Sequence, residues 1–293
     1  MSSTKGKGRM GQEKRSSDQM AEFYRDIHRK WVETDPNNSL APVTCPAAPR
    51  WFNYFVSFAH QLGMEKAIAF LRSKMGPLEG RSVLDLGCGR GRWTKKYASF
   101  GCRVTGVDIS LEAVQVLARE MPEHRFLCQD ISKLIVPSEA FDIANSVTVI
   151  QHMPTEQQRE TLKYATAALK KGGYLVLLEN TVDFDSPVVF PHSPKDWISM
   201  AEASGLQLCG SWESNYEVLF RTVIPSVKRL LSVGKRRDEN VGPADASMKR
   251  RGPSSRLKPA LYTLMAVPSF PLEWLACKVR VFEPSHEVMV FRK

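Results

Sequence analysis

The sequence has no apolar run of about eighteen residues, the length at which a segment becomes a candidate transmembrane helix. Its first residues, MSSTKGKGRMGQEKRSS, lack the apolar stretch of a signal peptide. Six cysteines are spread along the chain, at positions 45, 88, 102, 128, 209 and 277, and no two of them form a C-x-x-C pair. We therefore expect neither a transmembrane segment nor a disulfide framework, and we predict a reducing, cytoplasmic location.

Metal-ligand spacing is also missing, because acidic, histidine and cysteine side chains nowhere follow the spacing of ligand sets, and we expect no metal. The net charge of +10 raises nucleic acid or anionic lipid as partners. Much of the excess lies in residues 5–15 and 228–258, whose Gly, Ser, Pro and charge content is typical of solvated tails and loops. Nucleic acid therefore stays an alternative partner that the sequence does not favour.

The chain does have one highly organised stretch, SVLDLGCGRGRW, at residues 82–93. Its first five residues form a short apolar run broken only by Asp85, which predicts a buried strand. Gly87, Gly89 and Gly91 follow at alternate positions, and helical character resumes after them. Strand, glycine turn and helix in this order predict the opening βαβ unit of a nucleotide-binding sheet.

The spacing of the glycines indicates which class of ligand the turn binds. A nicotinamide or flavin fingerprint would read G-x-G-x-x-G, but Arg92 stands where its third glycine would be. Asp85 lies two residues before the first glycine, where a carboxylate suits a ligand with positive charge. The pattern D-x-G-x-G-x-G after a strand resembles motif I of the class I S-adenosylmethionine-dependent methyltransferases of the small-molecule type. The resemblance is close over residues 83–180 and looser over 194–212.

Two further acids stand at strand ends in agreement with this family. Asp108 ends the second predicted strand, where such folds hydrogen-bond ribose hydroxyls. Asp130 follows the third, and in the family an acid here commonly meets the adenine amino group while the next side chain, Ile131, packs on the ring. The resemblance implies S-adenosylmethionine as the cofactor, held by Asp85, Gly87, Cys88, Gly89, Gly91, Asp108, Ile109, Asp130, Ile131 and Ser146.

His152 and Glu179 are the candidates for a catalytic base. His152 lies in VTVIQHM after the fourth predicted strand, and the ordinary pKa of histidine suits removal of a proton from a hydroxyl or amine. In similar family members a histidine here often only caps or packs the following helix, and that alternative stays open. Glu179 ends the fifth predicted strand at the same edge of the sheet.

Three residues are candidates for substrate binding. Trp51 and Tyr54 belong to the dense aromatic start of a helix, WFNYF, and form a lid in one interpretation and helix–helix packing in the other. His192 lies in a loop with three prolines that follows the fifth predicted strand, where it would line a substrate cavity. Arg90, Arg92, Lys95 and Lys96 surround the start of the helix after the glycine turn, where they would pair with acids or face solvent, and we favour the second.

Strands and helices alternate along the chain, which predicts an α/β fold with a doubly wound, mostly parallel seven-stranded sheet. The N-terminal cap contains helices over 18–34, with Asp18 as N-cap, and over 50–75. We expect the last strand to be antiparallel and to lie at the edge of the sheet. The expected organisation is a basic tail (1–17), an N-terminal helical cap (18–78), a cofactor-binding core (79–216), an insertion (217–284) with a mobile basic loop (235–255), and the last strand (285–293).

We therefore predict a methyltransferase that transfers a methyl group to an oxygen or nitrogen of a small molecule or short peptide, working as a monomer or homodimer. A nucleic-acid methyltransferase is the first alternative. It would use the basic segments, but NSVT stands where an N/D-P-P-Y/F sequence would end the fourth strand. The second alternative is a non-catalytic protein that keeps the fold and binds the cofactor.

Overall fold

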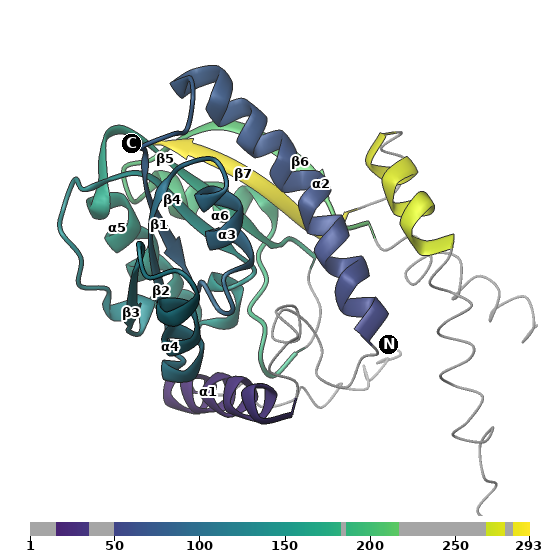
Figure 1. Ribbon diagram of the computed structural model, residues 1–293. Helices are drawn as coiled ribbons and strands as arrows, with labels where there is room; N and C mark the ends of the chain where they lie inside the picture. Colours follow the sequence, from purple (N-terminus) through teal and green to yellow (C-terminus); the bar gives the residue numbers. More distant parts are fainter. Residues whose placement is uncertain (1–15, 35–49, 183–185, 217–267, 279–283) are drawn as a thin grey trace, which may run out of the picture.

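The computed structural model describes residues 16–34, 50–182, 186–216, 268–278 and 284–293 (Figure 1). The expectations for the basic tail and for most of the insertion, including the loop at 235–255, lie outside these residues. The strands are β1 (Ser82–Leu86), β2 (Arg103–Asp108), β3 (Arg125–Cys128), β4 (Phe141–Val147), β5 (Leu169–Asn180), β6 (Gln207–Ser214) and β7 (His286–Arg292). The α-helices are α1 (Ser17–Thr34), α2 (Arg50–Met75), α3 (Arg92–Ala98), α4 (Leu111–Glu120), α5 (Thr155–Ala168) and α6 (Pro194–Glu202), with short 3-10 helices η2 (Ile131–Lys133) and η3 (Ile150–His152) and a further helix over 268–278.

The strands form one sheet in the order β3-β2-β1-β4-β5-β7-β6. β1 to β5 run parallel, and β7 is antiparallel to both β5 and β6. The predicted doubly wound, mostly parallel sheet is therefore confirmed. The predicted edge position of the last strand is wrong, because β7 lies between β5 and β6. Its residues 288–291 are all 0% exposed, and a continuous apolar run of this kind suits a strand that is covered on both faces.

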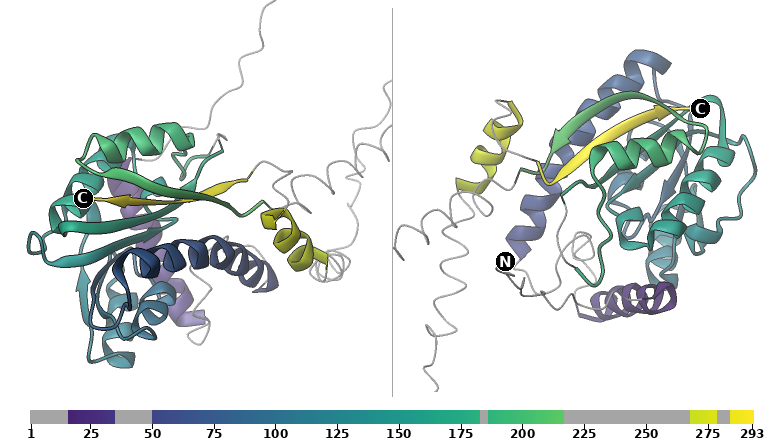
Figure 2. Two further views of the ribbon diagram at one scale, coloured as in Figure 1. Left: turned by 90° about the horizontal axis from the view of Figure 1, so that it is seen from above. Right: turned by 180° about the vertical axis from the view of Figure 1, so that it is seen from behind.

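Helices cover both faces of the sheet (Figure 2). On one face, Met64 and Leu71 of α2 and Tyr97 of α3 pack into a core cluster with side chains from the strands. On the other face, Leu162 of α5 and Trp197 of α6 pack into the second and larger cluster. The two N-terminal helices lie on different parts of this core, because α2 contacts β5, β6 and β7 whereas α1 contacts α4.

Helix α2 approaches the sheet closely at Gly63. A Cβ there would stand 2.7 Å from both Ser214 Oγ and Val288 Cγ2, which is shorter than real Cβ contacts allow. Gly63→Ala is expected to lower the free energy of unfolding by about 1–2 kcal/mol, because overpacking outweighs the gain of about 1 kcal/mol in helix propensity. Urea denaturation measures this change. Ser73→Ala, on the exposed side of the same helix, is the control and should stay within about 0.5 kcal/mol of wild type. A Gly63→Ala protein as stable as the control would contradict the close approach.

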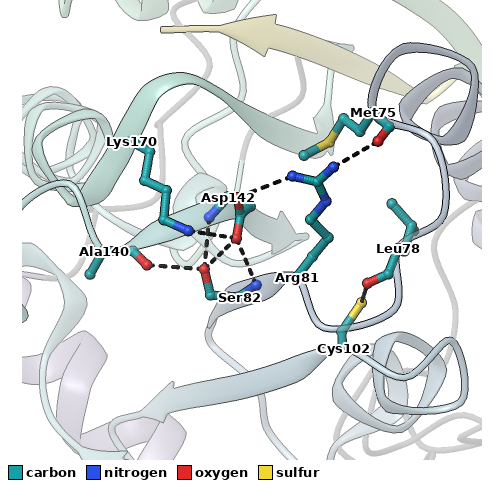
Figure 3. A network of polar contacts seen from close by, with 8 residues as sticks. All are labelled: Met75, Leu78, Arg81, Ser82, Cys102, Ala140, Asp142 and Lys170. Carbon is teal, nitrogen blue, oxygen red and sulfur yellow. Dashed lines mark hydrogen bonds and ion pairs between the residues drawn. The ribbon is translucent and has the colours of Figure 1, made fainter.

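The amino ends of β1 and β4 are joined by a polar network around Asp142 (Figure 3). The Asp142 carboxylate accepts hydrogen bonds from the backbone N–H of Ser82 (2.9 Å), from its hydroxyl (2.6 Å) and from Lys170 Nζ (2.8 Å). Burial by itself would raise the pKa of Asp142, but the hydrogen bonds from Lys170 and Ser82 outweigh it and lower the pKa to about 2. Because this network lies at the opposite edge of the sheet from the glycine turn, we assign it a structural role.

Helix α1 contacts two elements that follow the carboxyl ends of strands. It packs on α4, which follows β2, and its Tyr24 reaches His152 of η3, which follows β4. The N-cap of this helix is Ser16 and not, as predicted from the sequence, Asp18. The Ser16 hydroxyl accepts a hydrogen bond from the backbone N–H of Gln19, and Gln19 Oε1 accepts one from the backbone N–H of Ser16. Of the helices described, none is long and apolar enough to span a bilayer.

Candidate functional site

The glycine turn between β1 and α3 uses backbone conformations that favour glycine. The φ angles of Gly87 and Gly91 are 69° and 81°, in the left-handed region. A Cβ on Gly87 would also stand 2.4 Å from Val149, and one on Gly91 would stand 2.4 Å from Leu117. The turn is therefore closely packed by the protein's own side chains, which adds a second reason for glycine beside ligand approach.

Asp108, at the end of β2, holds this turn in place. Its Oδ2 accepts a hydrogen bond from the backbone N–H of Gly89 at 2.8 Å, and its Oδ1 accepts from the backbone N–H of Ser110 at 2.9 Å. The residue is 6% exposed. Asp108 therefore links the turn after β1 to the start of α4, and it does so at the carboxyl edge of the sheet, where nucleotides bind to folds of this kind.

Asp85 lies beneath the turn rather than on its surface. It is 2% exposed, and its oxygens accept from the Thr94 hydroxyl (2.6 Å) and from Asn145 Nδ2 (2.8 Å). Burial raises the pKa of Asp85 to about 6, against the effect of the hydrogen bonds from Thr94 and Asn145. Asp85 thus joins β1, α3 and β4, and its part in cofactor binding stays a prediction.

The other cofactor candidates fall into two groups. Cys88, Ile131 and Ser146 are buried: Cys88 packs with Leu117, Ile131 packs in the larger core cluster, and the Ser146 hydroxyl donates to Glu179. Ile109 and Asp130 are partly exposed. Asp130 Oδ1 accepts from the backbone N–H and hydroxyl of Ser132, and its Oδ2 has no hydrogen-bond partner among the described residues. Asp130 thus retains an acceptor for a ligand.

Glu179 holds the loop that follows β4. Its carboxylate, 0% exposed, accepts from the backbone N–H groups of residues 149, 150 and 151 and from the Ser146 hydroxyl, at 3.1–3.4 Å. This loop includes Thr148, whose φ of 54° is strained for a β-branched residue by about 1–3 kcal/mol. The contacts of Glu179 are those of a positioning residue, and its role as a base stays a prediction.

The pKa of Glu179 gives a test of this arrangement. Burial raises this pKa to about 7, against the backbone N–H groups and the Ser146 hydroxyl, which lower it. The pKa of Glu179 is higher in the folded chain than in the unfolded chain, where it is about 4.3. Its contribution to the free energy of unfolding is therefore complete below about pH 4.3 and is lost as the pH rises through about 7. Relative to Glu179→Gln, wild type should therefore lose about 3 kcal/mol of unfolding free energy between pH 4.5 and 8.

Urea denaturation at several pH values measures the difference. Glu160→Gln is the matched control, because Glu160 is a partly exposed glutamate paired with Lys163, and its profile should parallel that of wild type. Parallel profiles for wild type and Glu179→Gln would show that Glu179 titrates alike in the folded and unfolded chains.

His152 is held by hydrogen bonds on both sides of its ring. Nδ1 lies 2.8 Å from the Val188 carbonyl oxygen and 2.6 Å from the Tyr24 hydroxyl, and Nε2 lies 3.4 Å from Gln151 Nε2. Because a carbonyl oxygen only accepts, Nδ1 carries the proton and Nε2 is the basic nitrogen. Burial lowers the pKa of His152 to about 4, against the hydrogen bond to Val188. The ring is therefore neutral at pH 7, but it is a weaker base than an ordinary histidine.

The substrate candidates lie on α2 and in the segment between β5 and α6. The side chain of Trp51 lies outside the described part, and Tyr54 is 54% exposed on α2. His192 Nε2 lies 2.7 Å from Gln158 Oε1 of α5, and its ring contacts Trp197 of α6 edge to face. His192 belongs to the same segment as Val188, which receives the hydrogen bond of His152. All three substrate assignments stay predictions.

The surroundings of three residues at the site were not predicted. From the sequence, Tyr24 was assigned only to the apolar face of a helix. In the structure its hydroxyl contacts His152, as expected for a tyrosine hydroxyl that packs against the protein. Arg90 and Arg92 were expected to face solvent, and this is wrong: Arg90 is 8% exposed, and Arg92 has buried Nε and Nη1 atoms. Lys95 is exposed and pairs with Glu120. The described residues contain no group of three or more His, Cys, Asp and Glu side chains that could hold a metal.

Comparisons with known proteins agree on the central part of the chain. A family model described as "Methyltransferase domain" matches residues 83–173. The ubiquinone biosynthesis O-methyltransferase of Coxiella burnetii (strain Dugway 5J108-111) is 34% identical over 102 residues, covering 33% of this chain and 43% of that protein. The match therefore spans less than half the length of this curated relative.

Two solved structures show the same fold. The [4+2]-cyclase SpnF has a TM-score of 0.55 at 18% identity and covers 97% of this chain and 98% of its own. The magnesium protoporphyrin IX methyltransferase from Synechocystis PCC 6803, crystallised with S-adenosylhomocysteine, has a TM-score of 0.52 at 19% identity and covers 66% and 93% of the two chains.

Proposed function

We propose that the chain, whose residues 83–173 match a family model described as "Methyltransferase domain", transfers a methyl group from S-adenosylmethionine to an oxygen or nitrogen of a small molecule or short peptide. The observation that carries the proposal is the bond of 2.8 Å from Gly89 N to Asp108 Oδ2, which joins the glycine turn to the acid at the end of β2. The O-methyltransferase relatives favour oxygen as the acceptor and a small molecule as the substrate. A cyclase with the same fold shows that fold alone does not give the activity.

The residues at this edge fit the cofactor by their chemistry. Asp108 has two acceptor oxygens for ribose hydroxyls, and Asp130 Oδ2 is available for an amino group. The buried charge of Asp85, which has a pKa of about 6, lies beneath the turn and would attract a cationic ligand. When bound, S-adenosylmethionine supplies an electrophilic methyl group on a sulfonium.

The chain's own task is then to align the acceptor and to remove its proton where it carries one. Alignment of two reactants supplies up to about 7–11 kcal/mol of the barrier reduction. His152 Nε2 is the proton acceptor in this proposal, with Nδ1 held by Val188 and Tyr24. Glu179 keeps residues 149–151 in place, so its part in this proposal is to position η3.

A cytoplasmic location is part of the proposal. The cysteines in the described residues (Cys88, Cys102, Cys128, Cys209 and Cys277) are free thiols, which persist in a reducing compartment.

Calorimetry with S-adenosylhomocysteine and with NAD tests the cofactor. We expect S-adenosylhomocysteine to bind and NAD not to bind, because Arg92 replaces the third glycine of a dinucleotide fingerprint. Absence of S-adenosylhomocysteine binding would overturn the proposal.

Turnover is tested separately, with methyl-labelled cofactor and fractionated extracts of small molecules and of RNA. Label in a small-molecule fraction supports the proposal. Label in RNA alone, or no transfer by a chain that binds the cofactor, would favour one of the two alternatives.

A further inference from the structure

A buried basic cluster lies beside the glycine turn, on the face of the sheet that α2 covers. It consists of Arg92 at the start of α3, His60 of α2 and His286 at the start of β7. Arg92 Nη2 lies 3.3 Å from His60 Nδ1, and the ring centroids of His60 and His286 are 5.3 Å apart. His60 is 1% exposed and His286 is 9% exposed. The guanidinium of Arg92 also lies over the ring of Trp93, 4.9 Å from its centroid.

The protonation of His60 follows from its partner. A guanidinium can only donate, so His60 Nδ1 is the acceptor and the neutral ring carries its proton on Nε2. Burial, followed by the charges of Arg92 and His286, lowers the pKa of His60 well below its ordinary value. His60 therefore presents an N–H group at Nε2, and Arg92 provides the positive charge of the pair.

Three donors of this pair are buried without an acceptor in the described part of the chain. They are Arg92 Nε, Arg92 Nη1 and His60 Nε2. A buried donor without an acceptor destabilises the fold, and more so when it is charged. Arg92 forms no ion pair among the described residues. The charge of Asp85 raises the pKa of Arg92, but the Asp85 carboxylate accepts its hydrogen bonds from Thr94 and Asn145. A cation with two buried, unmatched donor nitrogens, beside a third unmatched donor on His60, is complementary to an anion.

We propose that Arg92 and His60 form a subsite for a carboxylate group of the methyl acceptor. The inference rests on the proposed function and names the class of its substrate. One guanidinium charge matches the single charge of a carboxylate, whose oxygens only accept hydrogen bonds. Arg92 directly follows the glycine turn, and His286 pairs with Asn180 at the carboxyl end of β5. The subsite thus lies at the carboxyl edge of the sheet, on the side of β5 and β7. The candidates for binding ribose and adenine, Asp108 and Asp130, lie on the other side, at the end of β2 and after β3.

The carboxylate could also be that of the cofactor's amino-acid end, and the experiment separates the two sources. Benzoate and its neutral analogue benzamide are titrated into the chain saturated with S-adenosylhomocysteine, and binding is measured by ligand-observed NMR. We expect benzoate to bind at least about tenfold more tightly than benzamide, which corresponds to about 1.4 kcal/mol. Arg92→Gln should abolish this preference and leave the affinity for S-adenosylhomocysteine within about twofold of wild type.

Lys96→Gln is the matched control, because Lys96 is a cation on the same helix that lies over Phe100, and it should keep the preference for benzoate. Equal binding of benzoate and benzamide by wild type overturns the subsite. A loss of about tenfold or more in S-adenosylhomocysteine affinity in folded Arg92→Gln also overturns it, because the donors then serve the cofactor. If Arg92→Gln does not fold, His60→Gln is read by the same criteria. Wild type that fails to bind S-adenosylhomocysteine refutes the proposed function itself, which is a separate result.

Discussion

Asp108→Ala is expected to weaken the binding of S-adenosylhomocysteine by about 2–4 kcal/mol, or roughly 30-fold to 1,000-fold. Two effects add. The ribose hydroxyls lose a charged acceptor, and such a bond is worth about 1.5–3 kcal/mol. The backbone N–H groups of Gly89 and Ser110 lose the carboxylate that joins them at 2.8 and 2.9 Å, so the glycine turn is no longer held to the end of β2. Calorimetry on the folded variant measures the loss.

Two further variants make the result specific. Asp108→Asn keeps the side-chain shape and one acceptor oxygen, so it should fall between wild type and Asp108→Ala. Asp142→Ala removes a carboxylate of equal size from the network at the amino ends of β1 and β4, and it should lower stability while leaving the affinity for S-adenosylhomocysteine unchanged. An unchanged affinity in folded Asp108→Ala would remove Asp108 from the cofactor site.

The sequence was most informative where local chemistry determines structure. The bounds of β1 and α2 agree with the predicted ranges 82–86 and 50–75, because an apolar run ending in a glycine turn and a long helical periodicity are both local signals. The place of β7 was not predictable in this way. Order in a sheet is a property of long-range pairing, and HEVMVFRK alone does not say whether one or both of its edges are bonded.

Burial of the charged residues around the glycine turn was the second gap. Arg92 was expected in solvent, yet α2 places His60 beside it, and the ring of His286 in β7 packs against that of His60. Those neighbours lie 32 residues before Arg92 and at the other end of the chain, so no local pattern indicates them. Tyr24 was missed for the same reason, since its partner His152 is 128 residues away.

His152→Ala is expected to lower kcat by about 10²–10⁴-fold while leaving the affinity for S-adenosylhomocysteine within about twofold, as loss of a general base requires. The assay uses the acceptor that the labelled-cofactor experiment identifies. The physical reason lies in the ring's hydrogen bonds: with the proton fixed on Nδ1 by the Val188 carbonyl, Nε2 is the nitrogen that can take a proton. Tyr24→Phe is the matched variant, because the Val188 bond still orients the ring, and its kcat should fall by less than about tenfold.

The pH dependence of kcat separates catalysis from support of η3. Because burial lowers the pKa of His152 to about 4, the ring stays neutral and able to accept a proton as the pH falls, and wild-type kcat should persist down to about pH 5. A histidine with an ordinary pKa of about 6.5 would lose activity well above that pH. If His152 only supports the loop, His152→Ala should instead lower stability and reduce binding and kcat together, with the shape of the profile unchanged. Full turnover by a stable His152→Ala protein would leave alignment of the acceptor as the whole contribution of the chain to catalysis.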